Sequence, residues 1–108
     1  METLFKALSD STRLRILSLL AQGECCVCEL ERALQLSQPN ISRQLNLLKT
    51  SGLLQSRKQA QWAFYQISSN FISAQPEFWV YLLEQFPTLP TYENDRKRLL
   101  DRQENNCI

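Results

Sequence analysis

Three cysteines lie within four consecutive positions of the chain, at Cys25, Cys26 and Cys28. Thiolates are soft ligands, so three of them without a nitrogen or hard-oxygen partner favour thiophilic ions over magnesium, calcium or manganese. The chain contains no histidine, which removes the commonest zinc ligand and the commonest general base. In a reducing compartment, such closely spaced cysteines indicate a metal or redox site rather than a disulfide framework. The alternative for each cysteine taken singly is a small buried core residue.

The spacing of these cysteines conflicts with a regular helix. Each residue of an α-helix turns by about 100°, so Cys26 and Cys28 would point about 200° apart and could not hold one small ion. Either the site precedes a helix, or binding unwinds the first turn of that helix. We take this conflict as the predicted switch, because reshaping the turn would tilt the elements that the helix supports. A helix N-terminus lowers the pKa of a thiol, whereas Glu24, Glu29 and Glu31 oppose this, so the net direction stays open.

The residues after the cysteines predict two helices joined by a short turn. The first covers 28–34, and the second has Ser37 as its N-cap, Pro39 in its first turn and Gly52 as its stop. Two helices in this arrangement form a helix-turn-helix unit, whose second helix can lie in the major groove of DNA. The buried face of the second helix consists of Ile41, Leu45 and Leu48.

The exposed face of the second helix is polar, basic and free of carboxylates. Between Arg32 and Pro76 there are five basic residues and no acidic one, although the formal net charge of the chain is only +1. Arg43 could bind a guanine edge with two hydrogen bonds, for about 1 to 3 kcal/mol of discrimination, or it could contact a phosphate. The predicted DNA-binding residues are Ser37, Gln38, Asn40, Ser42, Arg43 and Gln44, followed by Arg57 and Lys58 as phosphate contacts.

The segment from Leu4 to Ser68 resembles the ArsR/SmtB family of metal- and metalloid-responsive repressors. The resemblance is carried by LSDSTRLRIL near the N-terminus and by ECCVCELERALQLSQPNISRQLNLLKTSGLLQSRKQAQWAFYQIS. It points in particular to the arsenical-resistance repressors, in which a CVCxL element runs into an SQPxISRxLxxL recognition helix. It implies As(III) or Sb(III) as the inducer, held in a three-sulfur centre, with double-stranded operator DNA and a second copy of the chain as partners.

The same resemblance matches Cys26 and Cys28 to the two cysteines of the CVC element. Where some relatives continue CVCDLC, this chain has Glu31 at the last position, so the third sulfur ligand is open. The candidates are Cys25, which would share a helix face with Cys28 at i, i+3, Cys107, and an exogenous thiol.

The predicted fold is mainly α with a small β-hairpin: a homodimeric winged helix-turn-helix. Residues 1–108 would form a single domain, with a dimerisation helix in its C-terminal part and, as the resemblance implies, another at its N-terminal end. We expect helices over 3–8 and 11–21, the latter capped by Asp10 or Ser9. After Gly52 the apolar residues alternate, which predicts strands over 53–58 and 62–67 with a tip at 59–61 that lacks glycine.

The C-terminal third of the chain lies outside this resemblance. A helix from Pro76 to about Phe86 has a broad apolar face, which we assign to dimerisation. The charged segment 91–103 is predicted to be helical or disordered, and Cys107 falls in the terminal segment 91–108. No stretch has the eighteen apolar residues of a transmembrane helix or the pattern of a signal peptide, so we expect a cytoplasmic protein with no membrane partner.

The leading hypothesis is a homodimeric transcriptional repressor that leaves its operator on binding As(III) or Sb(III). A cadmium, lead or zinc sensor could use the same thiols, and a redox switch could instead oxidise Cys25, Cys26 or Cys28. From a different class, the chain could be a winged-helix protein-interaction module without a DNA role. An enzyme is the least favoured class, because the chain has no histidine, only two glycines and no paired carboxylates in a plausible cleft.

Overall fold

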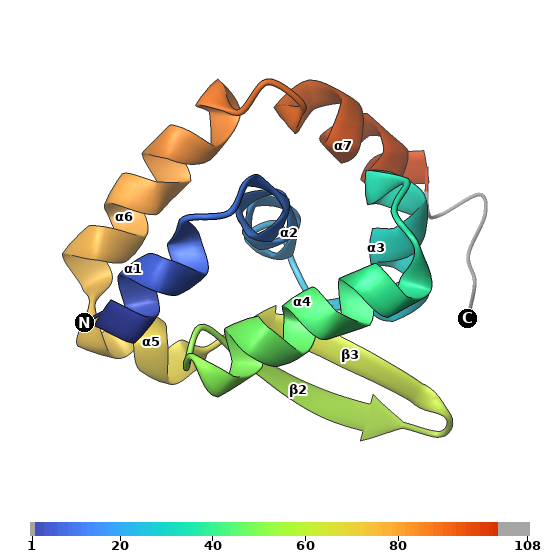
Figure 1. The fold of residues 1–108 in the computed structure, drawn as a ribbon, viewed down its shortest axis with the longest axis horizontal. Helices are drawn as coiled ribbons and strands as arrows, with labels where there is room; N and C mark the ends of the chain where they lie inside the picture. Colours follow the sequence, from blue (N-terminus) through green and yellow to red (C-terminus); the bar gives the residue numbers. More distant parts are fainter. Residues whose placement is uncertain (1, 102–108) are drawn as a thin grey trace.

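The computed structural model describes residues 2–101, which form a ring of helices around one central helix with a β-hairpin along one side. Figure 1 looks nearly down the axis of α2, with α1, α6, α7, α3 and α4 arranged around it. In chain order the elements are α1 (Glu2–Leu8), α2 (Ser11–Leu20), β1 (Cys25–Cys26), α3 (Val27–Leu34), α4 (Gln38–Thr50), β2 (Leu54–Gln59), β3 (Trp62–Ile67), α5 (Ser69–Ala74), α6 (Pro76–Gln85), the 3-10 helix η1 (Phe86–Thr88) and α7 (Tyr92–Leu100).

Helix α2 forms the centre of the core, and four of its last five residues are apolar. Residues 16–20 are all buried, which is the pattern of a helix surrounded by other elements. Its predicted cap is confirmed: the Asp10 carboxylate accepts hydrogen bonds from the backbone N–H groups of Thr12 and Arg13, at 2.8 and 3.1 Å. The predicted inward face of α4 is also confirmed, since Ile41, Leu45 and Leu48 are fully buried.

Helices α3 and α4 form the predicted helix-turn-helix. The Ser37 hydroxyl accepts a hydrogen bond from the Asn40 backbone N–H at the start of α4, and Pro39 lies in the first turn. Gly52 follows the end of α4 with a φ of 85°, a left-handed conformation in which glycine is unstrained. The residue that ends α3, Gln35, is also left-handed, with a φ of 58°.

Replacing Gln35 with glycine is expected to raise the free energy of unfolding by about 1 kcal/mol, because glycine adopts the left-handed conformation without strain. Urea unfolding at matched protein concentration measures the change. Gln85→Gly, at the right-handed end of α6, is the matched control and should instead lower stability by up to about 1 kcal/mol. Equal effects at both positions would contradict the assignment.

The sheet has the strand order β1-β3-β2 and is antiparallel throughout. The hairpin of β2 and β3 confirms the predicted wing, and its register runs from Leu54 opposite Ile67 to Gln59 opposite Trp62. The tip is therefore shorter than predicted: Gln59 belongs to β2, and the turn consists of Ala60 and Gln61. Ala60 has a φ of 57°, at a turn position that glycine usually occupies. Strand β1, which was not predicted, pairs Cys25 with Tyr65 and Cys26 with Phe64.

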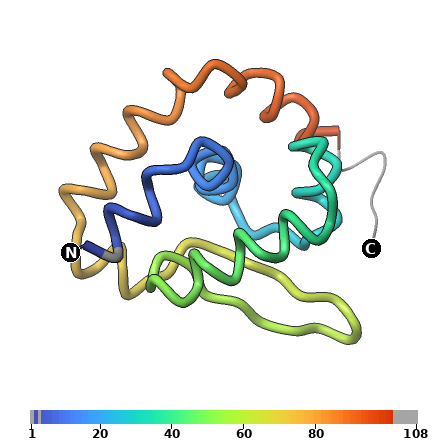
Figure 2. Tube along the Cα trace, viewed as in Figure 1, coloured from blue at the N-terminus to red at the C-terminus, as the bar shows by residue number. Residues whose placement is uncertain are grey.

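The C-terminal helices close the ring around α2. The predicted helix α6 is confirmed, and its aromatic residues meet those of α1 and α5 edge to face, with ring centroids 6.2 to 6.3 Å apart for Phe5 with Phe78 and for Phe71 with Trp79. The charged segment after Pro90 was predicted to be helical or disordered. It forms the helix α7 over Tyr92–Leu100. Figure 2 shows α7 running beside α3, against which it packs.

Candidate thiol site and nucleic-acid interface

The structure brings the sulfur atoms of Cys26 and Cys28 together. Cys26 ends β1 and serves as the N-cap of α3 with an extended backbone (φ −87°, ψ 166°), whereas Cys28 lies in the first turn of the helix. Their Sγ atoms are 2.9 Å apart. The predicted conflict assumed helical geometry at both residues. Because Cys26 is extended, the two sulfurs meet without any unwinding of α3.

Cys25 lies in a different environment from this pair. Its side chain is fully buried in the main hydrophobic core, with Sγ 3.6 Å from the Gly23 carbonyl oxygen. Successive side chains of a strand point to opposite faces, so Cys25 and Cys26 face apart. Within residues 2–101, no three cysteine, aspartate or glutamate side chains are grouped to hold a metal ion. The remaining intramolecular candidate for a third sulfur, Cys107, lies outside the described residues.

The surroundings of Cys26 keep its thiol protonated. Burial raises the pKa of Cys26, and the charge of the nearby Glu29 carboxylate raises it further, while a hydrogen bond from the Glu29 backbone partly offsets both. Glu29 also accepts a hydrogen bond from the Cys26 backbone N–H at 2.9 Å, which fixes the carboxylate at the start of α3. The pair can hold an ion only while both of its sulfurs are reduced.

Two surface hollows meet at Cys28. One, of about 460 Å³, runs along α3 past Glu31 and Arg32 to the helix-turn-helix turn. The other, of about 310 Å³, lies between the start of α3, Gln38 at the start of α4, and Trp62 on the wing. An ion that approaches Cys28 through this second hollow would therefore lie next to both parts of the predicted DNA-binding surface.

The predicted DNA-binding residues of the helix-turn-helix lie together on α4 and at its N-cap. Ser37, Gln38 and Arg43 are exposed, and Asn40, Ser42 and Gln44 are partly exposed. A hydrogen bond of 2.8 Å joins Gln38 to Ser42. Asn40, Arg43 and Gln44 are joined to one another and to Arg13 of α2, which the sequence did not single out. No spacing signal links Arg13 to α4, since Arg13 and Gln44 are 31 residues apart in the chain.

The two predicted phosphate contacts of the wing differ in their surroundings. Lys58 is exposed near the tip. The Arg57 guanidinium donates two hydrogen bonds to Glu24, at 2.7 and 2.8 Å, and lies 4.7 Å from the centre of the Phe64 ring. Arg57 is therefore held by a carboxylate of the segment that leads into β1, which offsets the charge that Arg57 could offer to a phosphate.

A helix-turn-helix followed by a β-hairpin, with a polar and basic second helix, defines a winged helix-turn-helix DNA-binding protein. The family model of the bacterial regulatory proteins of the arsR family matches residues 10–56. The ArsR2 arsenic resistance regulator of Pseudomonas putida is 46% identical over 82 residues, which cover 75% of this chain and 67% of that protein. The chain belongs to the ArsR family, whose members are DNA-binding transcriptional regulators and not enzymes.

Two further proteins are similar to this chain, one in sequence and one in structure. The arsenical resistance operon repressor of Escherichia coli is 58% identical over 66 residues, 60% of this chain and 56% of that protein, so the chain spans little more than half of this relative. The homodimeric winged helix-turn-helix domain of Mb0332 from Mycobacterium bovis, a possible ArsR-family regulator, superposes with a TM-score of 0.66 at 28% identity, over 78% of each chain. Between residues 2 and 101, no helix has the length and apolar character needed to cross a bilayer.

Proposed function

We propose that this protein is a homodimeric transcriptional repressor that binds operator DNA and dissociates when As(III) or Sb(III) binds to its cysteines. The observation that carries the proposal is the pair of Cys26 and Cys28 sulfurs, 2.9 Å apart at the start of the helix that supports α4. Arsenical resistance repressors among the relatives support the same ligand class. Trivalent arsenic prefers three sulfurs, so a third thiol completes the site.

Each possible source of the third sulfur would require a different structural change. Cys25 must leave the core and give up its pairing with Tyr65, because it lies on the opposite face of β1. Cys107 or an exogenous thiol could instead approach Cys28 through either surface hollow. The first route disrupts the sheet, whereas the others load the ion between α3, α4 and the wing.

The proposed release acts through the connections of the thiol segment. Strand β1 pairs with β3 of the wing, and Glu24 at its start holds Arg57 of β2. On the other side, Cys26 and Cys28 form the start of α3, which packs against α4. Gathering three sulfurs on one ion therefore displaces the wing and the reading helix relative to each other, and DNA affinity falls.

The proposed dimer uses the apolar surface of α1 and α6. Phe5, Val80 and Tyr81 are more than half exposed, which is unusual for large apolar side chains of a monomer. A hollow of about 230 Å³ lies beside them, lined by Leu4, Phe5, Gln75 and Phe78. A second copy of the chain would cover this surface and pair two reading helices for an inverted repeat, consistent with the homodimeric state given for the M. bovis protein.

The thiol variants Cys26→Ser and Cys28→Ser test the proposed function. A DNA duplex is first selected from a random library with reduced wild-type protein, and binding is then measured by fluorescence anisotropy with and without arsenite. We expect arsenite to weaken wild-type binding by about tenfold or more, a coupling free energy typical of allosteric proteins, and to leave both variants bound. Cys25→Ala should respond like the wild type if the third sulfur comes from elsewhere. Release that survives in both serine variants would reject the sensor assignment.

Glu24 is expected to restrain the wing in the DNA-bound state. Glu24→Gln removes the charge that holds Arg57, so we expect tighter binding to the selected duplex and a salt slope steeper by about 0.9, as one more phosphate is neutralised. Glu84→Gln on the exposed side of α6 makes the same charge change without releasing an arginine. If both variants gained affinity equally, the effect would be a general one of net charge and the restraint would be disproved.

The close approach of the Cys26 and Cys28 sulfurs, 2.9 Å apart, supports a second candidate, a thiol redox switch. Peroxide would oxidise two thiols to a disulfide and be reduced to two waters, with loss of DNA binding and no need for a metalloid. The same anisotropy assay with peroxide, followed by a dithiol reductant, distinguishes the candidates. Reversible release by peroxide with no response to arsenite would favour the redox switch.

A further inference from the structure

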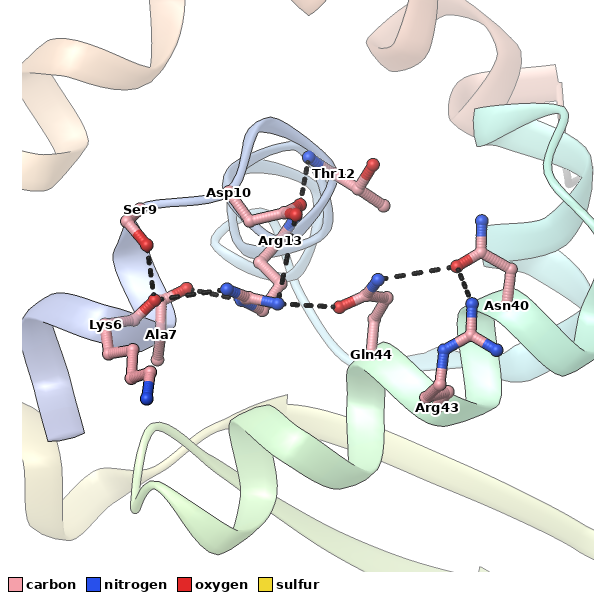
Figure 3. Close-up of polar contacts among 9 residues, drawn as sticks. All are labelled: Lys6, Ala7, Ser9, Asp10, Thr12, Arg13, Asn40, Arg43 and Gln44. Atoms are coloured by element: carbon pink, nitrogen blue, oxygen red, sulfur yellow. Dashed lines mark hydrogen bonds and ion pairs between the residues drawn. The ribbon is translucent and has the colours of Figure 1, made fainter.

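Arg13 lies between the end of α1 and the reading helix α4, as Figure 3 shows. Its guanidinium donates hydrogen bonds to the backbone carbonyls of Ala7 and Lys6, at 2.6 and 3.1 Å, and to Gln44 Oε1 at 3.1 Å. Its side chain is only 13% exposed. Arg13 therefore contacts the predicted DNA-reading surface from the protein interior and is itself too covered to read DNA.

The donors of Arg13 fix the orientation of the Gln44 amide. A guanidinium has five N–H donors and no acceptor, so the Gln44 atom that faces it must be the oxygen. The amide nitrogen of Gln44 then points to Asn40, whose Oδ1 accepts from it at 3.4 Å and from Arg43 at 3.2 Å. The Asn40 amide is oriented by the same logic, because its oxygen faces two donors (Figure 3).

This network determines which groups the reading helix offers to a DNA groove. The Gln44 oxygen faces the Arg13 guanidinium and the Asn40 oxygen accepts two protein donors. What these three residues still offer to bases is the second N–H of Gln44, the N–H groups of Asn40 and the remaining N–H groups of Arg43. Adenine is read by an amide that offers an oxygen and a nitrogen together, whereas guanine presents two acceptors, N7 and O6, in the major groove. The part of the face formed by Asn40, Arg43 and Gln44 therefore offers donors, and it matches guanine better than adenine.

We propose that Arg13 is a specificity-determining residue that does not touch DNA: it holds the Gln44 oxygen away from the groove, so that α4 selects guanine rather than adenine. The inference rests on the proposed binding of operator DNA and adds the base preference of the surface that makes it. Arg13 is a positioning residue, since it acts through Gln44. Its bonds to Lys6 and Ala7 also tie this preference to α1, one of the helices of the proposed dimer surface.

Selection from a random duplex library, sequenced for each protein, tests the proposal. The base position read by Gln44 is the one whose preference disappears in Gln44→Ala, and wild type should prefer guanine there. In Arg13→Met the Gln44 amide is released, so the guanine-to-adenine ratio at that position should fall by about tenfold, within the discrimination of one bidentate pair. Other positions and the salt slope should not change. Arg96→Met removes a partly exposed arginine on α7 and serves as the matched control.

Gln44→Glu gives a second test that leaves the Arg13 contacts with α1 in place. One carboxylate oxygen would pair with Arg13 and the other would replace the amide donor, so the preference should move from guanine to cytosine, whose N4 donates. An unchanged preference in both Arg13→Met and Gln44→Glu would overturn the proposal, as would adenine at the Gln44 position in wild type. If wild type enriches no sequence at all, the DNA-binding function itself fails, which is a distinct result.

Discussion

Replacing Asp95 with alanine is expected to lower the free energy of unfolding by about 3 to 5 kcal/mol, the usual cost of removing one partner of a buried ion pair. Asp95 is fully buried and accepts two hydrogen bonds from Arg15, both 2.9 Å long, and further ones from Arg98 and Thr91 at 2.9 and 3.0 Å. The hydrogen bonds with Asp95 raise the pKa of Arg15, so this guanidinium stays charged and would be left in the interior without its counter-ion.

The same cluster of Asp95, Arg15 and Arg98 connects α7 to α3, the first helix of the helix-turn-helix. Arg15 donates to the Leu34 carbonyl at 3.1 Å and Arg98 to the Ala33 carbonyl at 2.6 Å, so both arginines satisfy carbonyl groups at the end of α3. Urea unfolding at fixed protein concentration measures the loss. Glu93→Gln on the same helix removes an exposed carboxylate and should change stability by less than about 1 kcal/mol. A loss of stability in Asp95→Ala no larger than the small loss in Glu93→Gln would contradict the prediction.

Cadmium affinity is expected to rise with pH between about pH 6 and 8, by about tenfold per pH unit for each coordinating thiol that must release a proton. Arsenite affinity should stay nearly constant over the same range. Arsenous acid reacts with three thiols to form three As–S bonds and three waters, so each thiol proton leaves on a displaced hydroxide and no net proton is released. The raised pKa of Cys26 keeps its thiol protonated across this window, which makes the contrast large.

Competition titrations at several pH values, with the protein kept reduced, measure both affinities. The sign follows from the direction of the shift: a thiol whose pKa is raised holds its proton more strongly, so cadmium competes less well as the pH falls. Glu29→Gln removes the charge that raises the Cys26 pKa and should weaken the cadmium dependence near the upper end of the range. In the control Cys26→Ser, the cadmium affinity should rise by only about tenfold per pH unit. An arsenite affinity that rose with pH as steeply as the cadmium affinity would contradict the proposed thiol exchange.

Local signals in the sequence were sufficient for the helix-turn-helix and the wing. Ser37, Pro39 and Gly52 act within a turn of the helix that they begin or end, so their effects can be predicted without tertiary structure. The wing strands were predicted for the same reason, from alternation within each strand. Only the length of the tip was misjudged, because Gln59 and Trp62 pair across a two-residue turn.

The missed features depend on partners that are distant in the chain. Strand β1 has only two residues, too few for a periodic signal, and it exists because Tyr65 and Phe64 of β3 pair with it. Asp95 falls in the charged segment 91–103, for which no buried residue was predicted, and its burial follows from Arg15, 80 residues away. Of these missed features, β1 mattered most for predicting the thiol site, because the extended backbone at Cys26 brings the two sulfurs together.

The position of β1 at the edge of its sheet makes it a detachable strand. Its two pairs with β3 can open while β3 remains paired with β2 along six positions, so the hairpin stays intact when β1 leaves. Ligand-driven loss of β1 would therefore free the wing to swing as a preformed arm, without unfolding the domain. Return to the operator would then require only that two residues rejoin the sheet, which makes the switch quickly reversible once the ion departs.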